Sequence, residues 1–388
     1  MENNKRILSI DIMRGLTLFL MLFVNDLYTR GVPKWLVHTA ATEDGMGLAD
    51  WVFPGFLFMV GLSIPFAFSA RSKSNKELIL HILERTVSLL IIGIFMVNAG
   101  AVNAELTGIS KTLWIVSGYI AVFLIWNKYP KGSKLVYLKY AGILLLIILA
   151  FIYRGGTLEN PTRIEKGWWG ILGLIGWGYF SAAFTYLFFR DHIWKVTLAW
   201  LVFLGLNILS YLGLTDVLNP LKPIFGIVLD GNVPLIVISG LIIGILLKKY
   251  RTESTLFLRQ TIPIGFGALI MALVLHHWFI ISKIEATPSW GLLCTGISIL
   301  LFALLFYLID VKKKSAFFAP FKPAGENSLS TYLAPDIVYY LFWALPFQVL
   351  FYKQDESSLL AVGGSIVWAF AMIGFAALLA KINIRLKL

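Results

Sequence analysis

Residues 50–70 read DWVFPGFLFMVGLSIPFAFSA, and after Asp50 this run has no ionisable side chain. A helix of about 20 mostly apolar residues crosses a hydrocarbon layer roughly 30 Å thick, so the run is long enough to span a membrane. The same criterion, applied along the chain, predicts twelve spans. They cover approximately residues 7–28, 50–70, 79–99, 112–127, 136–153, 168–189, 194–213, 231–247, 261–281, 290–309, 328–348 and 358–380. The fourth is short and the eleventh carries Asp336 and two prolines, so ten spans are the alternative.

The overall composition agrees with a membrane protein. The chain has 388 residues, of which 58% are hydrophobic and only 14% are charged. Soluble domains average about 45–50% apolar and about 25% charged residues, so an ordinary soluble enzyme, a disordered chain and a secreted disulfide scaffold are excluded. The single cysteine, Cys294, excludes internal disulfides and thiolate metal clusters. We expect one all-α domain over residues 1–388, a polytopic transmembrane helix bundle in the lipid bilayer of the cell membrane.

The distribution of basic residues predicts the orientation of this bundle. Cytoplasmic connections of membrane proteins collect Lys and Arg. If the N-terminus is cytoplasmic and the spans alternate, 24 of the 33 basic residues lie on the cytoplasmic side. Both termini are then cytoplasmic, and residues 7–28 form an uncleaved first helix. The net charge of +12 is thus a signal of orientation, and we expect no nucleic-acid partner.

Ionisable groups at membrane depth are costly and are therefore the first functional candidates. Asp11 and Arg14 lie three residues apart, on one face of the first predicted helix near its cytoplasmic end. They are either a structural ion pair or part of a site for an anionic ligand. His81, Glu84 and Arg85 form a similar polar face on the third predicted span. That face either contacts an anionic ligand or lies at the membrane surface.

His38 is the most notable side chain in the outer connections. An imidazole titrates near neutral pH, so it can take up a proton, return it or accept an acyl group. Asp50 or Asp26 is suitable to orient its second nitrogen, as carboxylates do in catalytic triads. The alternative is a solvated loop histidine. The rival pair, His276 and His277, cannot converge on one ligand because adjacent helical residues diverge by about 100°, so a structural role is favoured there.

Several stretches resemble the heparan-α-glucosaminide N-acetyltransferase family and its bacterial relatives. The first hundred residues carry most of the likeness, and shorter matches occur late in the chain. Relative to the ten-helix core of that family, residues 168–213 look like a two-helix insertion. The matching stretches are Ser9-Ile-Asp11-Ile-Met-Arg14-Gly15, Phe23-Val-Asn25, His38, Leu48-Ala-Asp50-Trp-Val-Phe-Pro54-Gly-Phe56-Leu-Phe58-Met-Val-Gly61, Asp310-Val-Lys312 and Gly325-Glu-Asn327-Ser328-Leu-Ser-Thr-Tyr332.

The family moves an acetyl group from cytosolic acetyl-CoA to an amino sugar on the far side of the membrane. By position, the resemblance implies that His38 is the active-site histidine and that Asn25 and Asp50 are its polar neighbours. It places Asn327, with Ser328, in a central cavity that binds the donor. Arg14, paired with Asp11, would face the cytosolic end of acetyl-CoA. The resemblance also suggests a homodimer.

The resulting hypothesis is a membrane acetyltransferase that uses acetyl-CoA and acts on an extracytoplasmic amino sugar or glycan of the glucosamine type. His38 would serve as general base or as transient acetyl carrier, Asn25 would hydrogen-bond the thioester oxygen, and Asp50 would fix the imidazole tautomer. Two alternatives stay open. One is a transporter of sugars or amino sugars, since twelve spans are a common carrier plan. The other is a catalytically inactive membrane protein of the same family that only binds its ligand.

Overall fold

The computed structural model describes residues 7–69, 74–130, 132–347 and 349–388, and almost all of its regular structure is helical. The helices are α1 Leu8–Asp26, α2 Leu48–Ser69, α3 Asn75–Ala99, α4 Ala104–Thr107, α5 Lys111–Trp126, α6 Leu138–Ile152, α7 Gly170–Phe189, α8 Ile193–Tyr211, α9 Lys222–Leu229, α10 Asn232–Lys249, α11 Ser254–His276, α12 Pro288–Phe306, α13 Lys322–Glu326, α14 Ser328–Trp343 and α15 Ser358–Lys381. Short 3-10 turns occupy Thr29–Gly31, Lys34–Leu36, Lys134–Tyr137, Asp216–Leu218 and Ala316–Phe321, and a π-helical turn Tyr307–Val311 extends α12. The strands β1 Gly155–Gly156 and β2 Pro161–Thr162 form one small hairpin.

The all-α prediction is confirmed, and each predicted span contains a helix. In the described ranges, ten helices are long and apolar enough to cross a membrane. The fourth and eleventh predicted spans correspond to α5 and α14, which have only 16 residues each. The long helices therefore agree with the ten-span alternative. No comparison tests whether residues 168–213, which form α7 and α8, are an insertion, and this stays a prediction.

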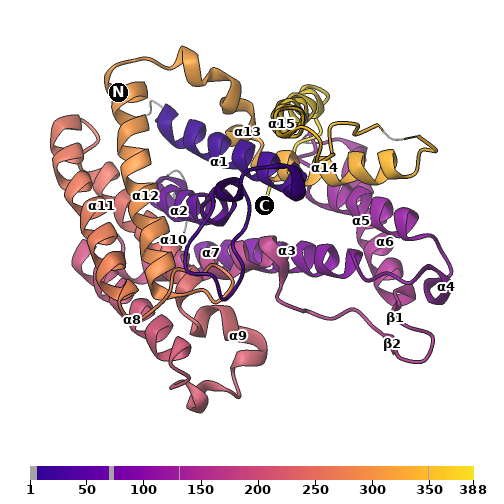
Figure 1. Ribbon diagram of the computed structural model, residues 1–388, viewed down its shortest axis with the longest axis horizontal. Helices are drawn as coiled ribbons and strands as arrows, with labels where there is room; N and C mark the ends of the chain where they lie inside the picture. Colours follow the sequence, from indigo (N-terminus) through magenta and orange to yellow (C-terminus); the bar gives the residue numbers. More distant parts are fainter. Residues whose placement is uncertain (1–6, 70–73, 131, 348) are drawn as a thin grey trace.

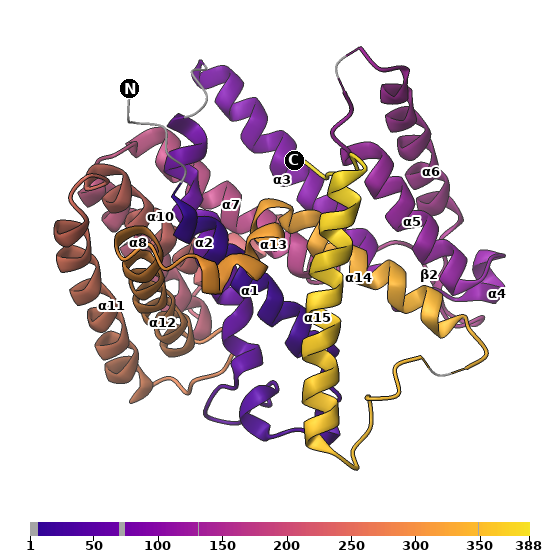
Figure 2. The same cartoon turned by 90° about the horizontal axis from the view of Figure 1, so that it is seen from above.

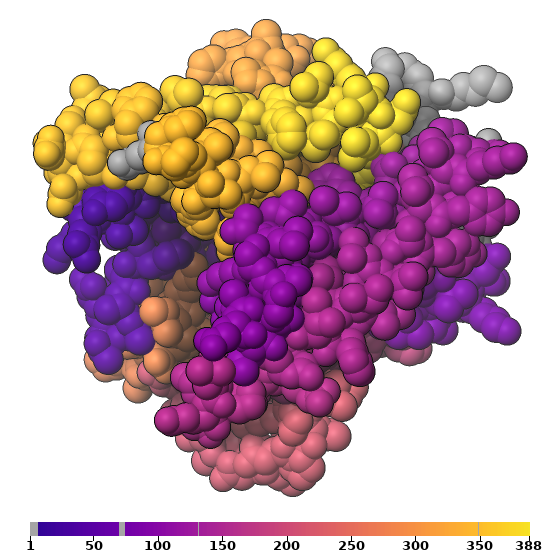
Figure 3. Space-filling view, turned by 90° about the vertical axis from the view of Figure 1, so that its right-hand side faces the viewer, coloured from indigo at the N-terminus to yellow at the C-terminus, as the bar shows by residue number. Residues whose placement is uncertain are grey.

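The helices are arranged in two flanks around a buried centre. Figure 2 shows α1 and α2 near the middle, with α8, α10, α11 and α12 on one flank and α3, α5 and α6 on the other. The most thoroughly buried long helices are α10, α1, α2 and α7, whereas α6, α8 and α11 are mostly exposed. Figure 3 shows the purple α5–α6 region lying beneath the yellow C-terminal segment. The exposed outer helices are rich in Leu, Ile and Phe, as expected of surfaces that face lipid.

Glycines allow α2 and α10 to cross in direct backbone contact. A Cβ on Gly61 would lie 1.7 Å from the carbonyl oxygen of Val237, and one on Gly240 would lie 1.9 Å from that of Phe58. Between membrane helices, small residues permit this approach and increase van der Waals contact. The crossing fixes α2, the helix that carries Asp50, against the core of the bundle.

Contacts between several connections agree with spans that alternate in direction. We call the end of the bundle that carries His38 the outer end and the opposite end the inner end, following the orientation predicted from charge. At the outer end, the Gly45 N–H donates to the Ile281 carbonyl at 2.9 Å. At the inner end, Asp310 accepts bonds from the first N–H groups of α1, and Lys128 N–H donates to the Arg385 carbonyl. Which end faces the cytoplasm stays a prediction. Five of the 24 basic residues on which this prediction rests lie outside the described ranges. These are Lys5, Arg6, Arg71, Lys73 and Lys131.

Candidate active site

His38 lies in the connection between α1 and α2, directly after the turn Lys34–Leu36 and the extended residue Val37. Its side chain is half exposed, at 50%. The connection is held by its own polar groups, since the Thr39 hydroxyl oxygen lies 3.0 Å from the Gly45 carbonyl oxygen and 2.9 Å from Asp50 Oδ2. Gly47 is required here because a Cβ would lie 2.0 Å from the Val37 carbonyl oxygen. This folded loop brings His38 back to the start of α2.

Asp50 binds the imidazole of His38. The Asp50 Oδ1 atom lies 2.6 Å from His38 Nδ1, and the Asp50 side chain is fully buried. Its second oxygen, Oδ2, accepts bonds from the Thr39 N–H, the Thr39 hydroxyl and the Gly47 N–H, at 2.9 to 3.1 Å. An ionised carboxylate only accepts hydrogen bonds, so Nδ1 carries the proton and Nε2 is the basic nitrogen. Among the described residues, none donates to or accepts from Nε2, which is therefore available to a substrate.

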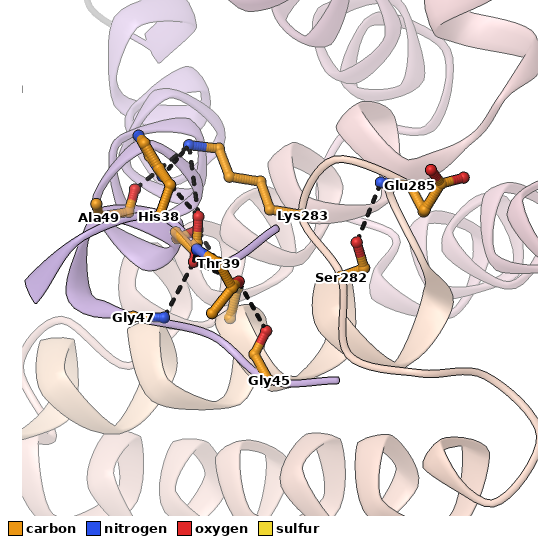
Figure 4. A network of polar contacts seen from close by, with 10 residues as sticks. His38, Thr39, Gly45, Gly47, Ala49, Ser282, Lys283 and Glu285 are labelled. Carbon is orange, nitrogen blue, oxygen red and sulfur yellow. Dashed lines mark hydrogen bonds and ion pairs between the residues drawn. The ribbon is translucent and has the colours of Figure 1, made fainter. Parts of the chain in front are cut away.

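Lys283 is a third member of this cluster that the sequence analysis missed. Its Nζ atom lies 3.2 Å from His38 Nδ1, 3.3 Å from the Ala49 carbonyl oxygen and 4.0 Å from Asp50 Oδ1 (Figure 4). The Nδ1 proton is already donated to Asp50, so the ammonium is held by the carboxylate and the carbonyl. Burial lowers the pKa of Lys283, and the neighbouring Asp50 opposes this shift. In the sequence, the only sign of this role was that Lys283 is the single lysine in the short connection between α11 and α12.

Buried amides hold the connection that carries Lys283. The side-chain nitrogens of Asn207 and Asn232 each donate to the Ala286 carbonyl at 3.0 Å. The Ser282 hydroxyl donates to the Ala41 carbonyl at 2.9 Å, which joins this connection to the His38 loop. Helix α12 starts immediately afterwards, with Thr287 as its N-cap and proline in its first turn. The histidine and the lysine, 245 residues apart in sequence, are thereby fixed side by side.

A pocket of about 670 Å³ opens beside the cluster. His38 and Lys283 contribute to its wall, together with Asp230 at the end of α9 and Asn232 at the start of α10. The remaining lining is apolar and comes from the first three turns of α2, the first two turns of α7 and α10, the first turn of α12, the segment before α7, α9, and the connection before α12. These residues are Phe53, Leu57, Trp168, Ile171, Leu174, Ile227, Val233, Ile236, Ile284, Ala286 and Trp290. The volume is in the range of small-molecule sites.

The other two candidates at the outer end have no hydrogen bond to His38 among the described residues. Asn25 is exposed near the end of α1, and no described hydrogen bond links it to His38 or Asp50. Asp26 is fully buried and accepts bonds from the hydroxyls of Tyr339 and Tyr352, and Lys353 Nζ lies 2.8 Å from it. Of the two carboxylates that could orient the imidazole, Asp50 does so, and Asp26 instead joins α1 to α14 and the connection after it.

His276 supports the His38 loop. Its Nε2 atom lies 2.8 and 2.9 Å from the two carboxylate oxygens of Asp44, and the Ile281 N–H also donates to Asp44. The Ile281 N–H and His276 together lower the pKa of Asp44. His277 contacts the ring of Trp278. The favoured structural reading of this histidine pair fits these contacts.

Arg14 joins three helices near the inner end. Its guanidinium donates to the Ser63 hydroxyl at 2.6 Å and to the Gly325 carbonyl at 3.2 Å, and lies 3.7 Å from the Asp11 carboxylate. Gly325 packs so closely on α1 that a Cβ would lie 1.9 Å from the Asp11 carbonyl oxygen. The predicted pair of Asp11 and Arg14 is thus present, as part of a junction of α1, α2 and α13.

Ser328, the first residue of α14, lines a second, smaller cavity of about 80 Å³. Its hydroxyl donates to Gly325, the residue that also binds Arg14, while the Asn327 side chain donates to the Pro323 carbonyl. Arg85 lines the same cavity and lies over the ring of Tyr179. Its buried Nε has no hydrogen-bond partner in the described ranges. Arg85 therefore faces the protein and not only the membrane surface. In the sequence, its position four residues before the apolar Leu89, which lines the same cavity, indicated that the two side chains share one face of α3.

Comparisons with known proteins find matches to parts of this chain. A family model described as a domain of unknown function (DUF5009) matches residues 6–194, a range that includes His38, Asp50 and Arg85. Heparan-alpha-glucosaminide N-acetyltransferase of Mus musculus is 30% identical over 142 residues, which cover 34% of this chain and 21% of the mouse protein. The Homo sapiens protein of the same name is 38% identical over 96 residues, or 24% of this chain and 14% of the human protein. The chain is a distant and partial relative of that enzyme. The matched segments span only about a fifth or less of the two curated proteins.

Proposed function

We propose that this protein is a transmembrane acetyltransferase that moves an acetyl group from acetyl-CoA at the inner end to the amine of a glucosamine-type amino sugar at the outer end. The observation that carries the proposal is the buried Asp50 carboxylate on His38 Nδ1, which leaves Nε2 available beside a pocket of about 670 Å³. This arrangement prepares a histidine for proton transfer or nucleophilic attack. The similarity to an N-acetyltransferase supports an acetyl group as the acyl group and acetyl-CoA as its donor.

In a ternary complex, Nε2 of His38 acts as general base. It removes a proton from the acceptor amine as the nitrogen attacks the thioester carbonyl, forming the new C–N bond. The C–S bond then breaks, and the imidazolium returns the proton to the leaving thiolate, which gives free CoA thiol. Asp50 stabilises the transient imidazolium through Nδ1–H. General acid–base catalysis of this kind typically contributes about 10²–10⁴-fold to the rate.

In the alternative ping-pong route, Nε2 itself attacks the thioester. The acetyl group then forms a bond to Nε2 as the C–S bond breaks, and CoA leaves before the acceptor amine takes the acetyl group from the imidazole. In either route Asn25 is proposed as a hydrogen-bond donor to the thioester oxygen. Lys283 adds a positive charge beside the pair, which favours the ionised form of Asp50.

The inner half of the bundle supplies candidate groups for the donor. Arg14, with Asp11, is proposed to lie at the entry for the CoA phosphates, and Asn327 and Ser328 to lie along its path. Arg85, which lines the small cavity, adds a partly buried cation whose Nε–H has no hydrogen-bond partner in the described ranges, and cationic donors suit phosphates. That cavity is lined by Phe56, Val60, Leu172 and Ile175. The same two helices, α2 and α7, line the outer pocket through neighbouring residues, so they form a wall shared by the donor side and the His38 side.

The test is transfer from labelled acetyl-CoA to glucosamine by purified protein in nanodiscs. We expect acetylglucosamine from the wild type and from His277→Ala, a histidine at the same end that has no contact with His38. We expect a rate at least about 100-fold lower from His38→Ala. Full transfer by His38→Ala would contradict the role of this histidine. Label trapped on the protein in the absence of acceptor would identify the ping-pong route.

Two further results would replace the proposal. Uptake of amino sugars into vesicles without acetyl-CoA would favour the transporter. Absence of any thermal shift with acetyl-CoA would favour a binding protein without catalysis. A homodimer in the cell membrane remains a prediction from the family resemblance, and native mass spectrometry of the nanodisc sample measures it.

A further inference from the structure

The pocket beside His38 has an unusual distribution of polarity for a sugar site. Its four polar lining residues are His38, Lys283, Asp230 and Asn232. Free amino sugars carry a hydroxyl or amine on nearly every carbon, and each polar group that is buried without a partner costs free energy. The eleven other lining residues are apolar. The interior of this pocket therefore suits hydrocarbon.

The polar groups are also largely occupied by the protein itself. The Asn232 amide nitrogen donates to Asn207 and to the carbonyls of Ala286 and Thr287. Asp230 Oδ1 accepts a bond from the Ser210 hydroxyl at 2.9 Å. His38, Lys283 and the second carboxylate oxygen of Asp230, which has no hydrogen-bond partner among the described residues, remain as the polar groups that can face a ligand, and all three residues lie in connections at the outer end. A ligand is thus contacted by polar groups only at its headgroup.

One buried donor in the wall of the pocket lacks a partner. Trp290 is 4% exposed, and its indole N–H has no hydrogen-bond acceptor among the residues that the structure describes. Buried tryptophans usually bond this group. An ether, ester or amide oxygen near the junction of headgroup and chain would supply the acceptor.

The mouth of the pocket is apolar as well. Trp168 and Ile284, which line it, are 54% and 60% exposed. Ile227 comes from α9, a helix of eight residues with no fully buried side chain. In Figure 1, α9 lies at one edge of the molecule, beyond α8. Tryptophan at a membrane–water interface is common, and these features favour entry of a ligand from the outer leaflet of the bilayer.

We propose that the acceptor is an amphiphile, an amino sugar attached to a hydrocarbon anchor, with its amine at His38 Nε2 and its chain in the apolar pocket. This inference rests on the proposed function and narrows its acceptor from a soluble sugar to a glycolipid. The oxygen that links sugar and chain accepts the Trp290 N–H. The apolar pocket supplies affinity, while the His38–Asp50 pair acts on the headgroup.

The experiment uses an alkyl glucosaminide with a diazirine in its chain, and free glucosamine, with protein in phosphatidylcholine nanodiscs. The first readout is photolabelling mapped by peptide mass spectrometry, which is independent of catalysis. We expect label on the pocket segments around Ile171 and Ile236. In Ile171→Trp and Leu174→Trp, the indole fills space in the pocket, and labelling should fall about tenfold, the effect of excluding about two methylene groups. Leu201→Trp on the exposed face of α8 is the matched control and should label like the wild type.

The second readout is acetyl transfer, which separates the two proposals. We expect kcat/KM to be at least tenfold higher for the alkyl glucosaminide than for glucosamine, which corresponds to the burial of about two methylene groups. Ile171→Trp should lose this preference because the indole takes the place of the chain. Trp290→Phe keeps an aromatic ring and removes the N–H, and should raise KM for the alkyl glucosaminide alone. Equal acetylation of both acceptors, with no label in the pocket, would overturn the amphiphile and leave the acetyltransferase standing. Pocket labelling without acetyl transfer to either acceptor would instead overturn the proposed function.

Discussion

The Nδ1 atom of His38 lies 2.6 Å from the Oδ1 atom of Asp50, in a hydrogen bond between a half-exposed imidazole and a fully buried carboxylate. The two residues are only 12 positions apart, yet they belong to different structural units. His38 is in a loop, whereas Asp50 is in the first turn of a buried helix. The pair therefore couples a reactive group at the surface to the rigid core.

Asp50→Asn should reduce both activity and stability. Asp50 accepts four hydrogen bonds through its two oxygens, and an amide would place an NH₂ group against one set of donors. We expect activity at least about 100-fold lower and a free energy of unfolding lower by about 1–3 kcal/mol. Initial rates and thermal unfolding measure these effects, with the exposed Asp355→Asn as control. Unchanged activity would show that Asp50 does not orient His38.

Asp26→Asn should reduce stability without a specific effect on catalysis. The carboxylate binds two tyrosines and Lys353 away from His38, and loss of its charge leaves these groups poorly paired. Burial and the neighbouring Asp26 raise the pKa of Tyr352, so its hydroxyl stays a donor. We expect about 1–3 kcal/mol lower free energy of unfolding, with the rate per folded molecule close to wild type. A large loss of rate at full folding would assign Asp26 to the active site.

Lys283 should make stability depend on alkaline pH. Its pKa is lowered from the ordinary 10.5, mainly because burial disfavours the ammonium. Between the lowered value and 10.5, the unfolded chain binds more protons than the folded one, so the free energy of unfolding rises with pH in that window. Lys283→Met should remove this rise. Thermal unfolding between about pH 8 and pH 11 tests it, with the exposed Lys34→Met as control, and an identical slope in Lys283→Met would be the contrary result.

Arg85→Gln should weaken binding of acetyl-CoA. Arg85 lines the small cavity, and its Nε–H is unpaired in the described ranges. If this N–H contacts a phosphate, its loss removes a charge-assisted hydrogen bond of about 1.5–3 kcal/mol. KM for acetyl-CoA should then rise by at least about tenfold, with kcat less affected. Arg259→Gln, on the exposed face of α11, is the control. An unchanged KM would place the donor site elsewhere.

Gly240→Ala should destabilise the bundle. Its Cβ would lie 1.9 Å from the Phe58 carbonyl oxygen, so α2 and α10 would have to separate, and such overpacking costs about 1–3 kcal/mol. Gly267→Ala on α11 is the matched control because no atom lies within 4 Å of its added Cβ. Equal melting temperatures for the two variants would show that the α2–α10 crossing is not tightly packed.

The sequence by itself determined the helical class and where the helices lie. Long apolar runs force the backbone to satisfy its hydrogen bonds locally, so hydropathy alone locates α1, α2 and the other long helices. The two weakest predicted spans are the two that form short helices, α5 and α14. His38 and Asp50 were also accessible to sequence reasoning, because an imidazole near a carboxylate in a structured loop has a recognisable chemistry.

Only the tertiary structure decided how the site is assembled. The residue pattern by itself left Asp26 and Asp50 as alternative partners for His38, and only the family resemblance favoured Asp50. In the structure, the hydrogen bonds of the two carboxylates separate them. Lys283 lies 245 positions from His38, and no local pattern shows that α2 and α12 begin side by side. The apolar pocket has the same origin, because it is formed by residues from separate helices, each of which by itself is an ordinary apolar helix. Local hydrogen bonding determines the helices, whereas packing between them determines which side chains meet.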